Sequence, residues 1–178
     1  VLGRSNWPIL VLIWSVFPLI NFFNFLRVPL APAISEEKRT KIRELLSSRY
    51  FLFVILGIAV GGATEVSMSQ WTSAFVEASL GLPKEVGDLL GLCLFALLLG
   101  SIRAVYGSWG DKFPLYKAML FGSVLCIACY VIAAFSPLPV ISLVACIFAG
   151  LGSGLLWPGS VVNGANRFPY AGSSLFAF

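Results

Sequence analysis

Glu65 is the residue of this chain whose type and position most directly suggest chemistry. It is the only ionisable residue well inside the apolar run 51–76, which is long enough to cross a bilayer as a helix. Counted from Tyr50 at about 1.5 Å per residue, Glu65 lies about 22 Å along that helix, past the midplane of a core about 30 Å thick. A carboxylate at that depth costs about 2.5–3.5 kcal/mol or more. It must therefore face a wet cavity, face a partner or be protonated.

Small and polar side chains share a helical face with this acid. The residues at helical spacing around Glu65 are Gly61, Gly62, Ser69 and Thr72. Such a face suits the lining of a cavity, in which the acid would carry a proton or accept a hydrogen bond from a polar solute. The alternative is a structural acid bonded to a neighbouring helix. Gln70 and Trp71 could border the opening of a site, although Trp71 also suits an aromatic anchor at the membrane interface.

A second constellation lies in the run 139–162, where three glycines precede Trp157 and Pro158. Gly150 and Gly154 form a small-x-x-x-small pair that lets helices approach closely. Pro158 has no N–H for the carbonyl of Gly154 and crowds that turn, which predicts a kink. The kink could be a gate hinge or a broken helix beside a substrate, or it could serve packing alone. Two further small-residue stripes are interpreted as packing seams: Ala96-Gly100-Ala104 and Ala118-Gly122-Cys126.

The composition indicates that these residues are surrounded by lipid. Of 178 residues, 58% are hydrophobic and 11% are charged, whereas soluble domains carry about 25% charged residues. The net charge of +4 does not indicate nucleic acid, because the positive residues lie between apolar runs rather than on one basic face. We expect a lipid bilayer as a partner and no nucleic acid.

Enzymatic chemistry is not expected. The chain has no histidine, no G-x-x-x-x-G-K pattern and no acid-rich cluster at membrane depth. Cys126 and Cys129 form a C-x-x-C, but they lie in an apolar run without nearby acids or a partner pair, so a structural role is favoured. We therefore expect no catalytic residues, no cofactor and no metal.

The chain divides into apolar runs of spanning length and polar connections. The runs are Trp7–Leu26, Phe51–Val76, Val86–Tyr106, Leu115–Phe135 and Pro139–Val162. A sixth run begins at Ala171. The longest polar segment, 27–49, is predicted to carry a short basic amphipathic helix, 38–48, which starts after a Ser35 cap and lies on the membrane surface.

The positive-inside rule assigns the two sides of the membrane. Because successive spans alternate in direction, the segments 27–49, 103–117 and 163–170 share one side, and they hold ten of the twelve lysines and arginines. Arg4 and Lys84 lie on the other side. We therefore expect the basic segments to be cytoplasmic.

The polar loop between the third and fourth runs carries a pattern of glycine, acid and bases. The pattern is formed by Gly107, Asp111, Lys112 and Lys117. It resembles the cytoplasmic loop signature of the major facilitator superfamily, G-x-x-x-D-R/K-x-G-x-R/K-R/K. Pro114 stands where the second glycine is usual and Tyr116 replaces one basic residue, a decay typical of the copy between helices 8 and 9. Taken alone, the charges also fit a solvated turn.

Other stretches resemble sugar-permease-like members of that superfamily, the fucose permease type. Three stretches are similar to helix 6 and helix 7 of these members: Phe25-Leu26-Arg27-Val28-Pro29-Leu30, Gly62-Ala63-Thr64-Glu65 and Gln70-Trp71. Three more stretches are similar to helix 10 and the start of helix 11: Leu156-Trp157-Pro158-Gly159, Arg167-Phe168-Pro169 and Gly172-Ser173-Ser174-Leu175-Phe176-Ala177. The similarity covers nearly the whole chain.

The resemblance implies an all-α polytopic membrane bundle, a partial major-facilitator fold that is mostly its C-terminal half. Residues 1–26 would be the sixth transmembrane helix of the parent and 27–49 its cytoplasmic central loop. Residues 50–178 would be the C-terminal bundle, truncated in its fifth helix. We therefore expect an internal piece of a larger protein, whose remaining transmembrane half is a partner.

The resemblance also implies a function, secondary active transport of a small polar solute by alternating access, with a sugar and coupled protons as candidates. Asp111 would dock on a neighbouring helix end, with Arg103 as a charge partner, and Glu65 would be the coupling or solute-binding acid. The implied location is the bacterial cytoplasmic membrane. The alternative is a non-transporting truncated or scaffold-type membrane protein.

Overall fold

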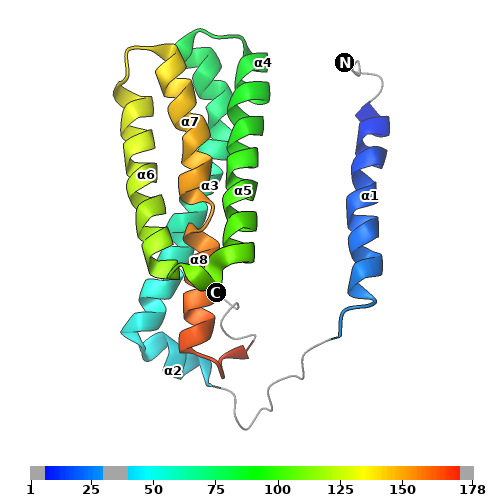
Figure 1. The fold of residues 1–178 in the computed structure, drawn as a ribbon, viewed down its shortest axis with the longest axis vertical. Coiled ribbons are helices and arrows are strands. Elements are labelled where there is room, and N and C mark those ends of the chain that lie inside the picture. Colours follow the sequence, from blue (N-terminus) through cyan, green and yellow to red (C-terminus); the bar gives the residue numbers. More distant parts are fainter. Residues whose placement is uncertain (1–6, 30–39, 173–178) are drawn as a thin grey trace. The chain divides into compact units, whose positions relative to one another are not determined.

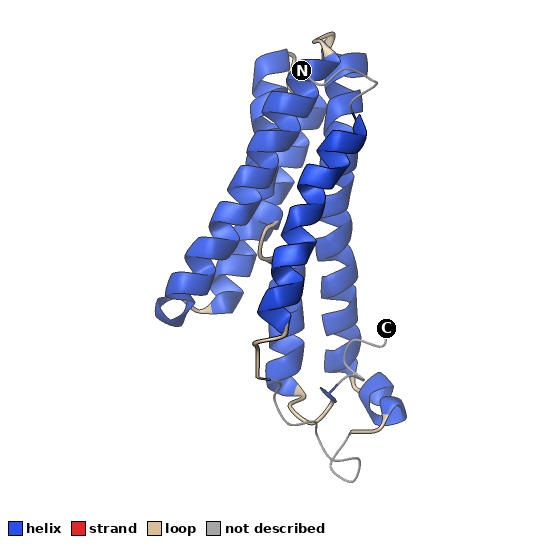
Figure 2. Cartoon of the chain, turned by 90° about the vertical axis from the view of Figure 1, so that its right-hand side faces the viewer, coloured by secondary structure: helices blue, strands red, loops and turns tan. Residues whose placement is uncertain are grey.

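The computed structural model of the chain describes residues 7–29 and 40–172, apart from the side chain of Asp111. These residues form helices and short connections, with no strand among them (Figure 2). Five helices in the described part are long and apolar enough to cross a membrane: Trp7–Phe25, Arg49–Leu80, Lys84–Trp109, Leu115–Phe135 and Pro139–Arg167. The all-helical, polytopic fold predicted from the sequence is confirmed.

The chain divides into two compact units, residues 1–35 and 36–178. The first contains helix α1 (Trp7–Phe25), which continues through Pro18 and whose residues are all exposed. Since α1 has no charged residue, this exposure is suited to a surrounding of lipid rather than water.

The second unit is a helical bundle (Figure 1). Its elements are α2 (Ile42–Ser47), α3 (Arg49–Leu80), α4 (Lys84–Val86), the π-helix η3 (Gly87–Leu92), α5 (Cys93–Trp109), the 3-10 turn η4 (Gly110–Lys112), α6 (Leu115–Phe135), α7 (Pro139–Ser153) and α8 (Leu156–Arg167). The sixth predicted run, which begins at Ala171, lies outside the described residues from residue 173 on, as do Ser35 and the start of the predicted basic helix.

Two boundaries differ from those predicted. Helix α3 continues past Glu77 and ends where Gly81 adopts a left-handed φ of 65°, a conformation that glycine takes without steric cost. The next span begins with α4 at Lys84 and continues as a π-helix, in which Gly87 and Gly91 let the backbone lie directly against α3. A Cβ on Gly91 would be 2.8 Å from the Cγ2 of Thr72. Periodicity along a single helix cannot reveal such a contact.

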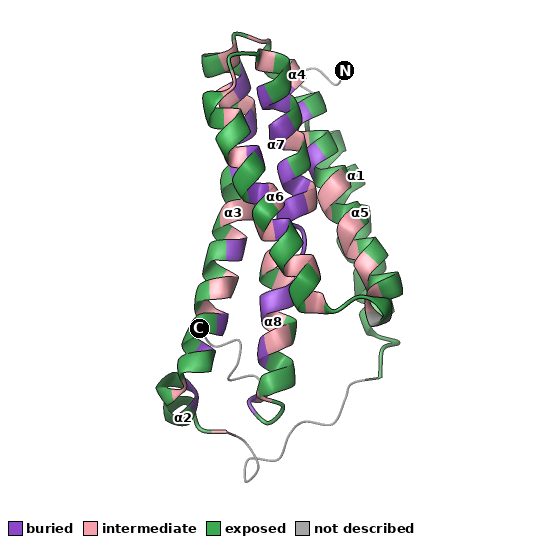
Figure 3. Ribbon diagram, turned by 60° about the vertical axis from the view of Figure 1, so that its left-hand side comes forward, coloured by how far each residue is buried: buried purple, intermediate pink, exposed green. Residues whose placement is uncertain are grey.

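Helix α7 is the centre of the bundle and is largely buried (Figure 3). On one side the Gly150 backbone lies against the Phe95 carbonyl of α5. On the other side Gly152 packs against Gly122 and Cys126 of α6, and a Cβ on Gly152 would be 2.8 Å from the Cys126 sulfur. The predicted close approach at Gly150 is confirmed, and so are the Gly122 and Cys126 positions of the predicted Ala118-Gly122-Cys126 seam.

The other predicted seam, Ala96-Gly100-Ala104, is wrong for this bundle. All three residues are exposed, and a Cβ on Gly100 would have no atom within 4 Å in the described structure. Helix α5 instead contacts α7 through Phe95 and Leu99, whose carbonyls lie against Gly150 and Gly154. A small-residue stripe shows that close packing is possible, but it does not show which face the neighbouring helix covers.

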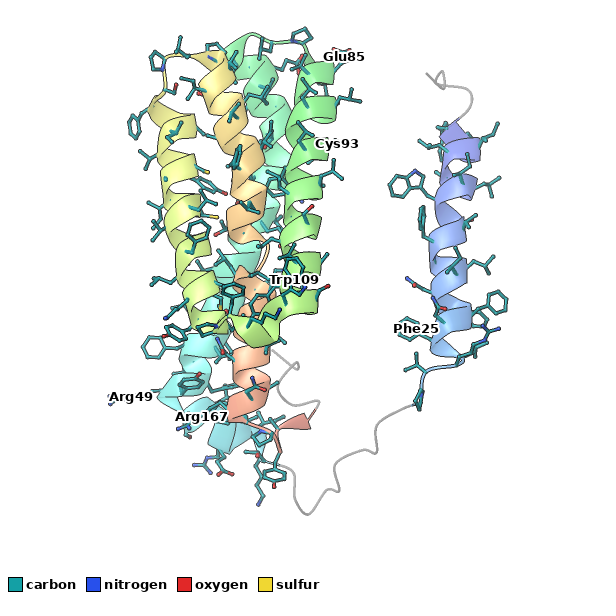
Figure 4. All side chains as sticks on the ribbon, in the orientation of Figure 1. Phe25, Arg49, Glu85, Cys93, Trp109 and Arg167 are labelled. Carbon is teal, nitrogen blue, oxygen red and sulfur yellow. The ribbon has the colours of Figure 1, made fainter. Side chains whose placement is uncertain are left out.

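Arg49 and Arg167 lie at one end of the bundle and Glu85 at the other (Figure 4). Helix α2 packs there, with Leu45 fully buried against Phe51 and Ala171. The Arg167 guanidinium carbon lies 5.6 Å from the centroid of the Tyr50 ring, a cation–π contact. A short helix therefore lies within the predicted range 38–48, but among the described residues it covers only Ile42–Ser47, and it packs on α3 and on the residues that follow α8.

Adding one methyl group at the centre of the bundle should be destabilising. Gly150→Ala would bring a Cβ against the Phe95 carbonyl, which belongs to the rigid backbone of α5. Overpacking of this kind costs about 1–3 kcal/mol. We expect a lower midpoint of thermal unfolding in detergent for Gly150→Ala. Gly100→Ala is the matched control and should be close to wild type, and an equal loss in both variants would contradict this packing.

Candidate functional site

An ion pair joins the middle of α3 to the last third of the span that contains α5. The Arg103 Nη2 donates to the Glu65 Oε2 at 2.6 Å. Their side chains are 33% and 20% exposed, respectively. Glu65 lies at the midpoint of α3 (Arg49–Leu80), a helix long and apolar enough to cross a membrane, and its carboxylate is partly enclosed. Its partner supplies the compensation that a charge at this depth requires.

Arg103 makes a second bond to the broken helix. Its Nε donates to the Gly154 carbonyl at 2.8 Å. Helix α7 ends at Ser153 and α8 begins at Leu156, so the predicted break is confirmed. Its physical cause is Pro158, which has no N–H to donate to the carbonyl four residues earlier, that of Gly154. The guanidinium therefore satisfies the acceptor that the proline leaves without a helical donor.

Trp157 completes this cluster. The Arg103 guanidinium carbon lies 5.9 Å from the centroid of the Trp157 indole ring, within the range of a cation–π contact. The indole is 39% exposed, so it is a partly open face beside the ion pair. The cluster of Glu65, Arg103, Gly154, Trp157 and Pro158 thus combines a carboxylate, a fixed cation and an aromatic face. Such groups can bind a polar solute and hold or release a proton.

The three candidates further along α3 are not brought to this cluster. The Ser69 hydroxyl donates to the Val66 carbonyl of its own helix at 3.1 Å. Gln70 is exposed, and so is Trp71, 68% of whose surface is accessible. Trp71 lines a separate, mostly apolar cavity of about 270 Å³ between α3 and α6. A role for these residues at the opening of the site stays a prediction.

Tyr130 was not singled out from the sequence, yet it reaches the same region. Its hydroxyl donates to the Thr64 carbonyl at 2.9 Å, beside Glu65 in the chain. Tyr130 also lines a cavity of about 600 Å³ between α3 and α6, together with the polar side chains of Thr64, Ser67 and Ser123. The available signal was a phenol inside an apolar run, since a buried tyrosine hydroxyl usually finds a hydrogen-bond partner.

The loop motif is arranged differently from the predicted polar hairpin. Helix α5 runs through Gly107 to Trp109, so the connection is shorter than predicted. The Tyr106 hydroxyl donates to the Phe113 carbonyl at 3.2 Å, which ties the loop back to α5. Lys112 and Lys117 are both exposed. These contacts hold the loop compactly against the end of the span.

The position of Arg103 requires a correction. The sequence placed it with the basic loop, as a charge partner for Asp111. It lies inside α5, and its ion-pair partner among the described side chains is Glu65. The Asp111 side chain lies outside the described residues, so its docking stays a prediction. The described residues contain no group of three or more histidine, cysteine or acidic side chains that could hold a metal ion.

The fold and the ion pair together define an integral, multi-pass membrane protein with a polar site inside its helical bundle. The family model described as Major Facilitator Superfamily matches residues 1–178, and the chain belongs to this superfamily. Its members are membrane transporters that handle small solutes. Comparison with curated proteins and with solved structures returned no match.

Proposed function

We propose that this chain carries the coupling acid of a secondary transporter that moves a small polar solute together with protons by alternating access. The observation that supports this proposal is the Glu65–Arg103 ion pair. Its acid lies at the middle of α3, and its arginine also donates a hydrogen bond to the Gly154 carbonyl at the break between α7 and α8. A carboxylate at membrane depth is tolerated when it is paired or protonated. It therefore has two low-energy states, which a coupling site needs.

A scaffold role is less well supported by the same residues. Replacing a buried ion pair with apolar residues of similar volume is often neutral or stabilising, so a pair of this kind adds little to a helix bundle that only has to be stable. Glycine contacts already hold α5, α6 and α7 together. The ion pair is better explained by a function that uses its charge.

The solute class follows from the cluster and from the resemblance. A neutral polyhydroxy solute such as a monosaccharide could donate hydrogen bonds to Glu65, accept them from Arg103 and lie against the exposed Trp157 ring. In this proposal the other transmembrane half closes the site, and the basic ends face the cytoplasm of a bacterial cell. The loop of Lys112 and Lys117 then lies on the inner side.

Uptake into proteoliposomes tests the proposal. The full-length protein, reconstituted with an inward proton gradient, should accumulate at least one member of a panel of radiolabelled neutral monosaccharides that includes fucose. A protonophore should abolish the accumulation without leaking solute from protein-free vesicles. Accumulation that is insensitive to the proton gradient would contradict proton coupling, and no protein-dependent uptake of any panel member would contradict the sugar assignment.

The loop acid should affect the conformational cycle rather than solute affinity. In the proposal, Asp111 docks on a neighbouring helix end in one conformation only, so Asp111→Asn should lower the maximal transport rate several-fold and leave the half-saturating solute concentration near wild type. Initial rates over a range of solute concentrations check this expectation. Asp88→Asn, an exposed acid at the other end of the bundle, is the control. A change in affinity alone would rule out this role for the loop.

A further inference from the structure

We infer that Arg103 is a positioning residue that couples the charge of Glu65 to the geometry of the α7/α8 break, an inference that rests on the proposed coupling role of Glu65. The Arg103 guanidinium donates two hydrogen bonds. Its Nη2 donates to the Glu65 carboxylate at 2.6 Å, and its Nε donates to the Gly154 carbonyl at 2.8 Å. A change at the first bond therefore reaches the second without any intervening side chain.

The break depends on this external donor because the helix cannot supply one. Pro158 occupies the position whose N–H would bond the Gly154 carbonyl. Regular bonding continues on both sides, from the Gly154 N–H to the Gly150 carbonyl at 3.2 Å and from the Gly159 N–H to the Leu155 carbonyl at 2.9 Å. The regular helical bonds are interrupted between these two, and within this interruption the guanidinium of Arg103 supplies a donor to the Gly154 carbonyl.

Protonation of Glu65 would loosen this arrangement. Protonation removes the negative charge, so the pair loses the Coulomb attraction between the guanidinium and the carboxylate. With Glu65 neutral, the guanidinium would be a cation without its counter-charge in a poorly solvated site, and it would turn toward water or solute. The Gly154 carbonyl would then lose its donor, which frees α8 to pivot at 154–155.

The face on which α8 rests permits such a pivot. Gly57 and Gly61 of α3 lie directly beneath α8, and a Cβ on either would be 2.7 Å from an atom of Ser160 or Trp157, respectively. Because glycine has no side chain, α3 has no side chain at these two positions that interlocks with α8. A surface of this kind allows small sliding movements between packed helices.

No second ionic partner competes for Glu65 within the described bundle. Arg103 is the charged group that α5 brings to it, and α6 brings the titratable Tyr130, which is bonded to the adjacent Thr64 carbonyl. Helix α7 contains no charged residue, and the one charged residue of α8 is Arg167 in its last turn. A pH-dependent change at the break can therefore be traced to one acid.

Spin-label distances across the break test the inference. The spin labels are attached to Val140→Cys and Ala165→Cys, at exposed positions near the far ends of α7 and α8, in a full-length background without native cysteines. The distance between the two labels changes with the angle between α7 and α8. Pulsed electron–electron measurements in nanodiscs without solute should give one narrow distance distribution at alkaline pH and a broader or shifted one at acidic pH. Glu65→Gln should give the acidic distribution at both pH values, and Glu77→Gln should keep the wild-type response.

Pro158→Ala separates this role from a general structural one. The alanine supplies the missing N–H, so the Gly154 carbonyl keeps a donor and the distance distribution should stay narrow at both pH values. Adding Pro158→Ala to Arg103→Gln should restore the narrow distribution that Arg103→Gln alone loses. A wild-type distance that is unchanged by pH, or a pH response that persists in Pro158→Ala, would overturn the inference. Either result leaves the proposed function standing if uptake still requires Glu65, because uptake is measured independently.

Discussion

Replacing Glu65 with glutamine should abolish accumulation of the solute by a proton gradient while leaving exchange of solute across the membrane. Glutamine keeps the hydrogen-bonding shape of the protonated acid but cannot release a proton. One pH unit corresponds to about 1.4 kcal/mol, so one coupled proton supports about ten-fold accumulation of a neutral solute. In Glu65→Gln the ratio of internal to external solute should fall to about one, while exchange of labelled for unlabelled solute continues.

Glu77→Gln is the matched control for this variant, because Glu77 is an exposed acid on the same helix and outside the cluster. It should accumulate solute as the wild type does. Normal accumulation and unchanged pH dependence in Glu65→Gln, at equal amounts of reconstituted protein, would remove Glu65 from the mechanism. Loss of both accumulation and exchange would instead indicate a solute-binding role without coupling.

Removing Arg103 should be the most destabilising single change at the site. Arg103→Met would leave Glu65 without its partner and the Gly154 carbonyl without a donor. Breaking one side of a buried pair costs about 3–5 kcal/mol, although protonation of Glu65 and its partial exposure reduce that cost here. Thermal unfolding in detergent should show a marked fall in midpoint, whereas Lys117→Met, at an exposed position on α6, should be close to wild type.

A double-mutant cycle identifies the source of this loss. Combining Arg103→Met with Glu65→Gln removes both charges, so the double variant should be more stable than Arg103→Met alone. It should not recover fully, because the Gly154 carbonyl still lacks its donor. Strictly additive effects would mean that the two residues do not interact, which would contradict the ion pair.

The fold and two parts of the site could be predicted because their causes are local in the sequence. A single acid in an apolar run has a free-energy cost in the membrane, and a proline four residues after Gly154 removes a helical hydrogen bond, whichever helices pack beside them. The spans themselves followed from their length and lack of charge. For the same reason the apolar run Leu115–Phe135 was placed at the bounds that α6 has.

The pairing of Glu65 with Arg103 could not be predicted because it depends on how α3 and α5 are rotated toward each other. The positive-inside rule counts charges near the helix ends, so it assigned Arg103 to the loop although its side chain reaches into the span. The same limit explains the exposed Ala96-Gly100-Ala104 stripe and the unforeseen contact of Tyr130 with Thr64.

Solute-driven proton movement is the measurement that tests the central role of Glu65 most directly. Vesicles with a trapped pH indicator and no initial pH gradient receive the transported monosaccharide from outside. Wild-type protein should acidify the vesicle interior as solute enters, and Glu65→Gln should admit solute without any change in internal pH. Internal acidification by Glu65→Gln at the wild-type ratio of protons to solute would contradict the assignment of the coupling proton to Glu65.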